Sequence, residues 1–281
     1  MKLAHLILTH ANPDQLNRLI GKLMYADAHF YVHVDLKTDI APFLPLAKNG
    51  NVTFISNRIR VHWGGFSIVQ ATINSFEEIL KTGIAYDYIN LLSGQDYPIK
   101  SNKKIHRFFS EQPGKIFMHS LSVENEWTEA IPRIKKYHLA NLNLPFGKYR
   151  AEQIINAILP ERKLPKGIVA MGRSQWFTAS REAITYIVEY VKKEPWVTKF
   201  FKYSWAADEL FFQTILFNSP LKDKIVNDNL VYIDWSGGGA SPKVLTMADA
   251  PILNASDKLF ARKFNPDTDR AILDYIDSIT S

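Results

Sequence analysis

The amino-acid sequence predicts an α/β protein built around a largely parallel sheet. Short, continuous apolar runs alternate with amphipathic stretches, and polar residues bound each run. A strand that helices cover on both faces has such a continuous apolar sequence, whereas a strand with one face in water alternates. Hydrophobic residues make up 46% of the 281 residues, enough for one continuous core. We therefore expect a single domain over residues 1–281.

The first three elements are predicted to form a strand–helix–strand unit. Leu3–Leu8 and Phe30–Val34 are the apolar runs predicted as strands. Between them, Asn12 and Pro13 indicate a helix start, because a capping side chain followed by proline is typical of a first turn. The apolar residues that follow have helical spacing: Leu16, Leu19, Ile20 and Leu23. This pattern is typical of a βαβ unit.

The same alternation continues along the chain. The sequence predicts a strand, an amphipathic helix, a second strand and a short helix in the segments Val52–Ile55, Ser67–Leu80, Tyr88–Leu92 and around Ile105–Phe109. This order places a Rossmann-like half in roughly the first 120 residues.

The rest of the chain is less regular. Ser122–Lys166 has no clear periodicity, and long irregular segments of this kind often form functional lids. Beyond it we expect two helices, a strand and a closing helix in the segments Ser180–Val191, Glu209–Phe217, Leu230–Ile233 and Asp267–Ile279.

Composition excludes several classes of site. The chain has no cysteine, which excludes disulfides, thiolate metal sites and a cysteine nucleophile, and favours a reducing compartment. The net charge of +6 suits phosphate-bearing ligands, an anionic membrane surface or nucleic acid. The longest basic runs are pairs such as Lys103-Lys104, so we expect no nucleic-acid partner. Met1–Leu8 is too short to span a membrane and is predicted as a buried strand.

Five segments carry the motifs of most interest: Tyr31–Asp35, Val61–Ser67, Leu91–Ile99, Gly172–Phe177 and Ala206–Gln213. In order and spacing they resemble the core-2/I-branching β-1,6-N-acetylglucosaminyltransferase family, to which the peptide O-xylosyltransferases are related. The segment Lys258–Phe264 closes the series, and the resemblance spans nearly the whole chain.

The resemblance implies a GT-A-like glycosyltransferase fold with a mixed central sheet. It divides the chain into a nucleotide-binding half, residues 1–120, and an acceptor-binding and catalytic half, residues 121–281. The implied reaction is inverting, metal-independent transfer from a UDP-sugar to a glycan hydroxyl, with N-acetylglucosamine as the favoured sugar. UDP-xylose or another UDP-sugar donor, and a catalytically silent nucleotide-sugar or glycan-binding protein, stay open as alternatives.

Donor-binding residues are expected where the first strands end. Ligands of open α/β sheets bind beyond the carboxyl ends of the strands, so Thr9, His10 and Asp35 are placed to face one crevice, with Asp35 toward the ribose or uracil. The alternative for Asp35 is a turn-forming role. Trp63 and Gly64 precede a helix, and glycine there allows close approach of a ligand; the alternative is a turn, with Ser67 as the helix N-cap.

The acidic residues do not predict a metal site. Asp96 follows an apolar strand, where many transferases of this fold have an Asp-x-Asp motif, but one carboxylate makes a poor Mg²⁺ or Mn²⁺ site. The resembling family also works without metal, so no cofactor is expected. Asp267 and Asp269 are predicted to open the last helix, a structural role.

Without a metal, fixed cations must stabilise the departing diphosphate. The candidates are Lys258, Arg262 and Lys263, and Lys263 best matches the basic residue of the family. The family has a second basic residue upstream, which the segment Asp234–Lys243 does not identify.

Catalysis is predicted at Asp208 and Glu209. The pair is expected to open a helix, whose dipole keeps a carboxylate ionised, and the resemblance makes Glu209 the base that accepts the acceptor proton. The alternative is an acidic helix start without chemistry.

Acceptor-binding residues are sought among aromatic and charged side chains. Trp176 and Trp205 are expected to stack on sugars, with core packing as the alternative for both. Glu126 and Arg133, in the irregular segment, are placed on the acceptor side, where the family has charged residues.

The resemblance and the composition together predict the cellular setting. Eukaryotic family members are Golgi membrane proteins rich in disulfides, whereas this chain shows no anchor and no cysteine. We therefore expect a cytoplasmic, bacterial-type enzyme that extends a surface or capsular polysaccharide. A lipid-linked saccharide acceptor would hold it at the inner membrane face, where basic residues favour docking.

Overall fold

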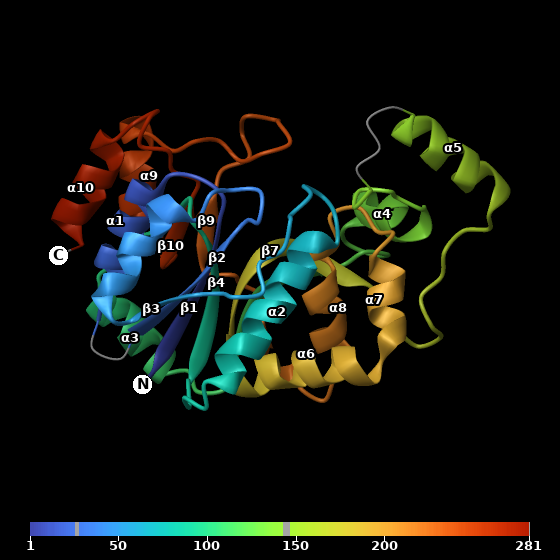
Figure 1. The fold of residues 1–281 in the computed structure, drawn as a ribbon, viewed down its shortest axis with the longest axis horizontal. Coiled ribbons are helices and arrows are strands. Elements are labelled where there is room, and N and C mark those ends of the chain that lie inside the picture. Colours follow the sequence, from blue (N-terminus) through green and yellow to red (C-terminus); the bar gives the residue numbers. More distant parts are fainter. Residues whose placement is uncertain (26–27, 143–146, 281) are drawn as a thin grey trace.

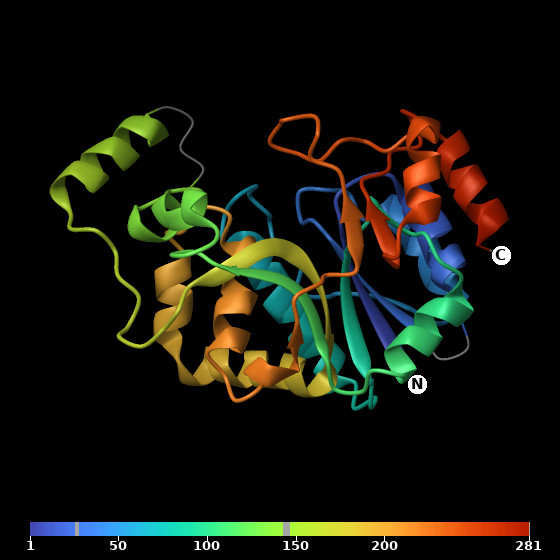
Figure 2. The ribbon, with the colours of Figure 1, turned by 180° about the vertical axis from the view of Figure 1, so that it is seen from behind.

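A seven-stranded sheet lies between two layers of helices in the computed structural model, which describes residues 1–25, 28–142 and 147–280 (Figure 1). Helices α1, α3 and α10 cover one face of the sheet, and α2, α6 and α8 cover the other (Figures 1 and 2). The helices span α1 Pro13–Leu23, α2 Ser67–Lys81, α3 Asn102–Ser110, α4 Ile131–Lys135, α5 Lys148–Ile158, α6 Arg181–Lys193, α7 Pro195–Phe201, α8 Phe211–Phe217, α9 Ala250–Ala255 and α10 Ala271–Ile279.

The strands of the large sheet follow the order β3-β2-β1-β4-β7-β6-β8. The first four are parallel, and β7 runs antiparallel to both β4 and β6. These strands span β1 Leu3–Thr9, β2 Ala28–Val34, β3 Val52–Phe54, β4 Tyr88–Ser93, β6 Ile116–Ser122, β7 Met171–Ser180 and β8 Ile225–Val226.

A second, three-stranded sheet has the order β5-β10-β9. Its strands span β5 Asp96–Pro98, β9 Val231–Ile233 and β10 Phe260–Arg262. Because β5 follows β4 after two residues, this sheet begins at the carboxyl end of the parallel strands. The antiparallel register of β5 and β10 places Arg262 opposite Asp96.

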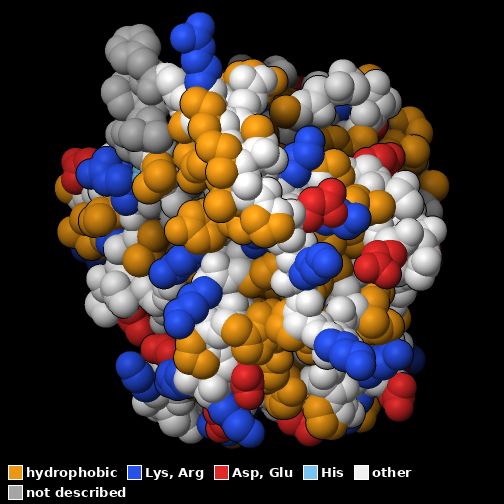
Figure 3. Space-filling view, turned by 90° about the vertical axis from the view of Figure 1, so that its right-hand side faces the viewer, with side chains coloured by type: hydrophobic (Ala, Val, Ile, Leu, Met, Phe, Trp, Pro, Cys, Tyr) orange, Lys and Arg blue, Asp and Glu red, His pale blue; other side chains and the backbone are white. Residues whose placement is uncertain are grey.

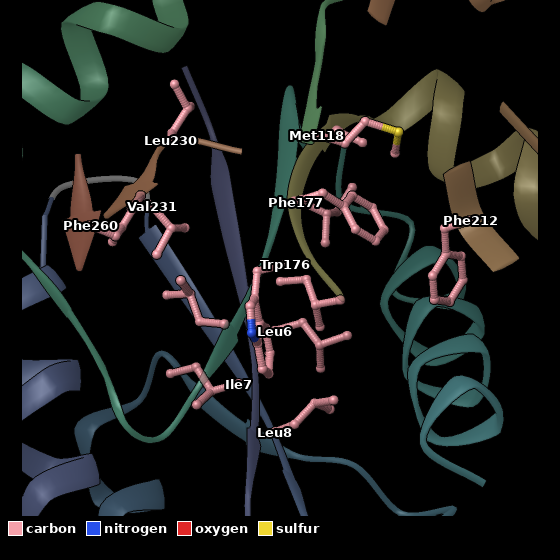
Figure 4. Close-up of a cluster of buried hydrophobic side chains, with 14 of the residues drawn as sticks. Leu6, Ile7, Leu8, Met118, Trp176, Phe177, Phe212, Leu230, Val231 and Phe260 are labelled. Atoms are coloured by element: carbon pink, nitrogen blue, oxygen red, sulfur yellow. The ribbon is translucent and has the colours of Figure 1, made fainter. Parts of the chain in front are cut away.

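The core is continuous across both halves of the chain. All seven residues of β1 are buried, as expected for a strand covered on both faces. Figure 4 shows Leu6 of β1 beside Trp176 of β7. On the helical side, the rings of Phe177 and Phe212 lie 5.3 Å apart, which joins β7 to α8.

The first 110 residues confirm the predicted order of strands and helices. Asn12 caps α1 as expected, since its Oδ1 accepts a hydrogen bond from the Gln15 amide at 3.3 Å. The prediction that Ser67 caps α2 is wrong. Phe66 occupies the N-cap position, and the Ser67 hydroxyl accepts from the His62 amide at 2.7 Å, which stabilises the preceding turn.

The sequence did not predict β7, which lies between β4 and β6. Arg173, Ser174 and Gln175 interrupt the apolar run in its first half, so it lacks the pattern of a buried strand. After Ser122, the last residue of β6, the segment up to Lys166 contains α4 and α5 and no further strand among its described residues; residues 143–146 lie outside them.

Two predicted helix starts are wrong. The last helix begins at Ala271, not Asp267, because Asp267–Asp269 form a turn before it. Asp269 has the structural role expected of it, accepting hydrogen bonds from the amides of Met247 at 2.8 Å and Ile272 at 3.2 Å. The other wrong start is that of α8, which begins at Phe211 and not at Glu209. None of the helices in the described parts of the chain has both the length and the apolar character of a membrane span.

Candidate active site

Asp208 and Glu209 lie in a 3₁₀ turn, Ala207–Glu209, just before α8. The prediction that they open the helix is wrong, because Leu210 has φ −124° and breaks the helical backbone before Phe211. Ala206 has the left-handed values φ 49° and ψ 52°, so the chain turns sharply ahead of the acidic pair.

Gly172 of β7 makes room for this turn. A Cβ at position 172 would collide with the Glu209 carbonyl oxygen and come within 2.7 Å of the Leu210 side chain. On the other side, the Ala206 amide donates a hydrogen bond to the Gly64 carbonyl oxygen at 2.8 Å. Backbone packing therefore positions the acidic pair.

Glu209 forms an ion pair with Arg133 of α4, with 2.5 Å between Oε2 and Nη1. Both side chains are 27% exposed, so the carboxylate is accessible from solvent. The Arg133 guanidinium lies 4.7 Å from the centre of the Trp127 ring, which supports it by a cation–π contact. The structure thus brings together two of the predicted site residues from segments 76 positions apart.

Asp208 has a different environment from its neighbour. Burial, with the nearby Glu209 charge, raises the pKa of Asp208 to about 7. Its Oδ1 atom is buried and has no hydrogen-bond partner among the described residues. The expectation that a helix dipole keeps this carboxylate ionised is wrong, because desolvation dominates.

Arg262 of β10 pairs with Asp96 and lies close enough to the acidic pair for their charges to interact. Its Nε lies 3.4 Å from Asp96 Oδ1. Burial lowers the pKa of Arg262, and the carboxylates of Asp96, Glu209 and Asp208 raise it. Burial also raises the pKa of Asp96 to about 6, while the Arg262 charge opposes this rise. The guanidinium is therefore a fixed cation beside the predicted base.

The structure corrects two predicted ligand contacts near Arg262. Asp96 is fully buried, and its Oδ2 accepts from the Ser93 amide at 2.8 Å, so it supports Arg262 from below and is closed to a donor. Trp176 is 8% exposed, and the Arg262 guanidinium covers its ring at 4.4 Å. The face expected to stack on a sugar is thus occupied, as the core-packing alternative predicts.

Thr9 and His10 line a cavity of about 300 Å³ at the carboxyl ends of β1 and β4. Other lining residues are Asn12, Gln15, Ser93, Gly94, Gln95, Asn265 and Asp267. Gly94 makes the close approach of the two strands possible, because a Cβ there would lie 2.7 Å from Thr9 Oγ1. This is the edge of the sheet where the sequence predicts the nucleotide.

Asp35 is engaged in its own turn. Its Oδ1 accepts hydrogen bonds from the amides of Lys37 at 2.9 Å and Val61 at 3.3 Å, and Lys37 Nζ lies 3.5 Å from Oδ2. It is 6% exposed and is not among the described residues that line the cavity. These contacts are those of the turn-forming alternative.

Trp63 and Trp205 form an aromatic pair, with ring centres 5.1 Å apart. Gly64 has φ +70°, and a Cβ there would lie 2.8 Å from the Trp205 ring. The glycine therefore makes room for Trp205, as expected of the turn-forming alternative. Trp63 is 68% exposed, which leaves one aromatic face of the pair open.

The basic candidates differ in whether they are already paired. Lys258 contacts Asp228 at 2.7 Å, and Lys243, from the segment searched for a second cation, contacts Asp249 at 2.6 Å. Lys263 has no carboxylate partner within the parts of the chain that the structure describes. Among the described residues, Lys263 is thus the candidate without a carboxylate partner, whereas Arg262 already pairs with the buried Asp96.

Glu126 has a local structural role. Its Oε2 accepts a hydrogen bond from the Ser122 amide at 2.8 Å, which closes the turn after β6.

The sequence did not predict Trp127 and Arg173 as site residues. The Arg173 guanidinium lies 5.4 Å from the Trp127 ring. The sequence also did not predict the packing role of Gly172, although this residue opens one of the motifs. No group of three or more His, Asp and Glu side chains in the described ranges could hold a metal ion.

The family model for the core-2/I-branching enzyme matches residues 3–258. Xylosyltransferase 2 of Rattus norvegicus is 28% identical over 301 residues, covering 99% of this chain and 33% of the relative. Xylosyltransferase 1 of Canis lupus familiaris is 29% identical over 244 residues, covering 84% of this chain and 24% of the relative. The chain thus spans a third or less of the length of these relatives.

Two solved structures are also similar. The apo crystal structure of mouse xyloside xylosyltransferase 1 is 11% identical, with a TM-score of 0.41 and coverage of 92% of this chain and 97% of that chain. A cytidylyltransferase from Leptospira borgpetersenii is 11% identical, with a TM-score of 0.30 and coverage of 71% of each chain. Both TM-scores lie below 0.5, so neither likeness supports a conclusion about function.

The match over residues 3–258 confirms the resemblance to the branching enzymes and the relationship to peptide xylosyltransferases. The strand order agrees with the implied GT-A-like fold, because a parallel Rossmann-like half continues into a mixed sheet through β7. The five motifs lie within the matched range, and Arg262 and Lys263 lie shortly beyond its end at residue 258. This chain belongs to the core-2/I-branching enzyme family.

Proposed function

We propose that the chain is an inverting glycosyltransferase that moves a sugar from a UDP-sugar to a hydroxyl of a glycan acceptor. The environment of Glu209 supports this proposal most: a partly exposed carboxylate that Arg133 orients at 2.5 Å, with the Arg262 guanidinium nearby. Family membership supplies the reaction class, and the site supplies residues of the required chemistry.

In the proposed step, Glu209 accepts the proton of the acceptor hydroxyl while the hydroxyl oxygen bonds to the anomeric carbon. The bond from that carbon to the diphosphate oxygen breaks on the opposite face, and UDP leaves with the bonding electron pair. One displacement inverts the anomeric configuration. Arg262 and Lys263 are the cations proposed to stabilise the charge that develops on the diphosphate.

Metal independence is part of the proposal. Its support is that Asp96, the one acidic residue at the place of the metal motif, is fully buried and paired with Arg262. The cations that would replace a metal are built into β10 and the residue after it.

The donor is proposed to occupy the cavity at Thr9 and His10 with its nucleotide. N-acetylglucosamine is the sugar that the branching enzymes favour. Xylose is a second candidate, because relatives named xylosyltransferases align with 99% of this chain. Asp35 has no direct contact with the donor in this proposal, because it is buried and its Oδ1 already accepts hydrogen bonds from two amides.

The acceptor is proposed to approach Glu209 near Arg133 and the exposed ring of Trp63. Trp205 supports that ring. A cytoplasmic location at the inner membrane face, with a lipid-linked saccharide as acceptor, is the setting that we propose for this reaction.

A donor screen tests the proposal. UDP, UDP-N-acetylglucosamine, UDP-xylose and UDP-glucose are compared by thermal shift, since a ligand that binds only the native state at 100 times its Kd stabilises by about 2.7 kcal/mol. The stabilising UDP-sugar is then incubated with oligosaccharide acceptors, and UDP release and the product's anomeric configuration are measured. We expect transfer with inversion. Binding without transfer would favour the catalytically silent binding protein, and absence of any UDP-sugar binding would overturn the proposal.

A further inference from the structure

Helix α5 lies at one end of the molecule, beyond α4 and α7 (Figure 1). It is a helix of 11 residues, and none of them is buried. Helices of globular proteins normally bury an apolar stripe against the core. Helix α5 is therefore unusual, because no buried apolar stripe attaches it to the rest of the molecule.

Polar side chains hold α5 in place. Glu152 Oε1 accepts a hydrogen bond from the Leu139 amide at 2.7 Å. Asn156 accepts from the Tyr137 amide at 2.7 Å and donates to the Tyr137 carbonyl oxygen at 2.8 Å. Because Glu152 and Asn156 are four positions apart, they share one helix face, and that polar face is turned toward the protein.

The apolar side chains point the other way. Ile154 and Ile158 are also four positions apart, and each is two positions from a polar anchor, which places them on the opposite side of the helix. Ile154 is 59% exposed and Ile158 is 75% exposed, and Leu159 at the helix end is 46% exposed. The helix thus presents its apolar face to the surroundings.

The segment after α5 is firmly attached. Arg162 is 8% exposed, and its Nη1 donates to the carbonyl oxygens of Lys136 and Tyr203, each at 2.9 Å. Its guanidinium also lies 4.1 Å from the centre of the Phe200 ring. The exposed apolar face is consequently a fixed part of the surface.

Basic residues surround this apolar face. Exposed or half-exposed Lys148, Arg150, Lys163 and Lys166 lie on α5 or shortly after it. The acidic residues of the same stretch are already used: Glu152 in its backbone bond and Glu161 in an ion pair with Lys135 at 3.3 Å. Figure 3, which faces this end of the molecule, shows hydrophobic side chains gathered on the surface, with several lysine and arginine side chains and a few acidic ones near them.

We propose that α5 docks the protein on an anionic phospholipid surface. An apolar face flanked by cations suits the membrane interface, where apolar side chains enter the acyl boundary and cations contact the headgroups. The proposal rests on α5 and its flanking residues and does not depend on the donor or on Glu209. For a transferase with a lipid-linked acceptor, it would place the enzyme where that substrate is.

Vesicle co-sedimentation of the full chain tests the proposal. Vesicles of phosphatidylcholine alone are compared with equimolar phosphatidylglycerol and phosphatidylcholine at two salt concentrations. We expect binding to the anionic vesicles that weakens with salt. The double variant Ile154→Gln, Ile158→Gln should bind about ten-fold more weakly or worse, and Arg150→Gln, Lys163→Gln and Lys166→Gln should each weaken binding about five-fold.

Ile252→Gln is the matched control, because Ile252 of α9 is 49% exposed and α9 lies at the opposite end of the molecule (Figure 1). It should bind like the wild type, and circular dichroism should show that all variants are folded. Equal vesicle binding by the double variant and the wild type would overturn the proposal. Absence of vesicle binding by the wild type would also overturn the proposal. If the wild type then forms a dimer that the double variant does not form, the apolar face is a protein interface.

Discussion

At the residue scale, the acidic pair contains two carboxyl groups with different surroundings. Glu209 is partly exposed and ion-paired with Arg133, whereas burial raises the pKa of Asp208 to about 7. Neighbouring carboxyl groups with different environments are a common arrangement at sites of acid–base chemistry, where one group reacts and the other shapes its field. Substitution of the two residues should therefore have different effects.

Replacing Glu209 tests the assignment of the base. Glu209→Gln removes the proton acceptor but keeps the shape of the side chain, so kcat should fall about 10²- to 10⁴-fold. UDP affinity should stay near the wild-type value, because the proposed nucleotide site is formed by other residues. Steady-state kinetics and UDP titration measure both. Glu129→Gln is the control, since the Glu129 side chain is 82% exposed. Near-normal turnover of Glu209→Gln would refute the assignment.

Asp208 should influence stability through pH. Its pKa in the folded protein, about 7, lies above the ordinary value of 3.8, so the folded state binds more protons than the unfolded state between these values. Its contribution to stability is therefore present at low pH and is lost as the pH rises toward 7. Asp208→Asn removes this loss. The Tm of the variant minus the Tm of the wild type should therefore increase from pH 4 to pH 7. A constant Tm difference would contradict the raised pKa.

Lys263 should contribute to diphosphate binding. Lys263→Ala removes a cation that no carboxylate among the described residues neutralises, so affinity for UDP should fall several-fold or more. Lys258→Ala is the comparison, because Lys258 is already paired with Asp228 at 2.7 Å. Calorimetric titration with UDP distinguishes the two. Equal affinities for the two variants would move the role away from Lys263.

At the scale of elements, β7 and the 3₁₀ turn before α8 fit together through a glycine. The turn carries Glu209, and its backbone packs directly on Gly172. The strand therefore contributes to the site through the absence of a side chain. The same principle applies at Gly64, where Trp205 fills the space of a missing side chain.

Gly172→Ala should displace the turn. The added Cβ collides with backbone and with Leu210, and such overpacking costs about 1–3 kcal/mol of the free energy of unfolding. Because the displaced atoms include the Glu209 backbone, kcat should fall by more than the stability loss explains. Gly21→Ala in α1 is the control, since nothing lies within 4 Å of its Cβ position. Denaturant unfolding and kinetics of both variants are the measurements. Wild-type activity of Gly172→Ala would show that the turn tolerates the shift.

At the scale of the whole molecule, the candidate site combines distant parts of the chain. Arg133 comes from α4, Glu209 from the turn before α8, and Arg262 from β10 of the small sheet. Because the cations are side chains of the fold, activity should survive EDTA with little change. UDP release is measured with and without the chelator after dialysis. Loss of activity that Mn²⁺ restores would overturn metal independence.

Much of the fold follows from local pattern. Continuous apolar runs predicted β1, β2 and β4, and helical spacing with a cap predicted α1, because burial on both faces and the first turn of a helix leave marks in neighbouring residues. The pattern failed at β7, because the polar residues Arg173, Ser174 and Gln175 interrupt its apolar run. It also failed at β5 and β10, which are short and become strands only by pairing across the fold.

By itself, the sequence determined the α/β class, the parallel half, the family resemblance and the candidate pair Asp208 and Glu209. Only the tertiary structure decided that Arg133 pairs with Glu209, that Asp96 and Trp176 are buried beneath Arg262, and that Gly172 receives the turn. The physical reason is the distance along the sequence over which each kind of interaction acts. Propensity and periodicity act between residues close in sequence, whereas ion pairing, desolvation and steric fit depend on side chains that only the folded chain brings together.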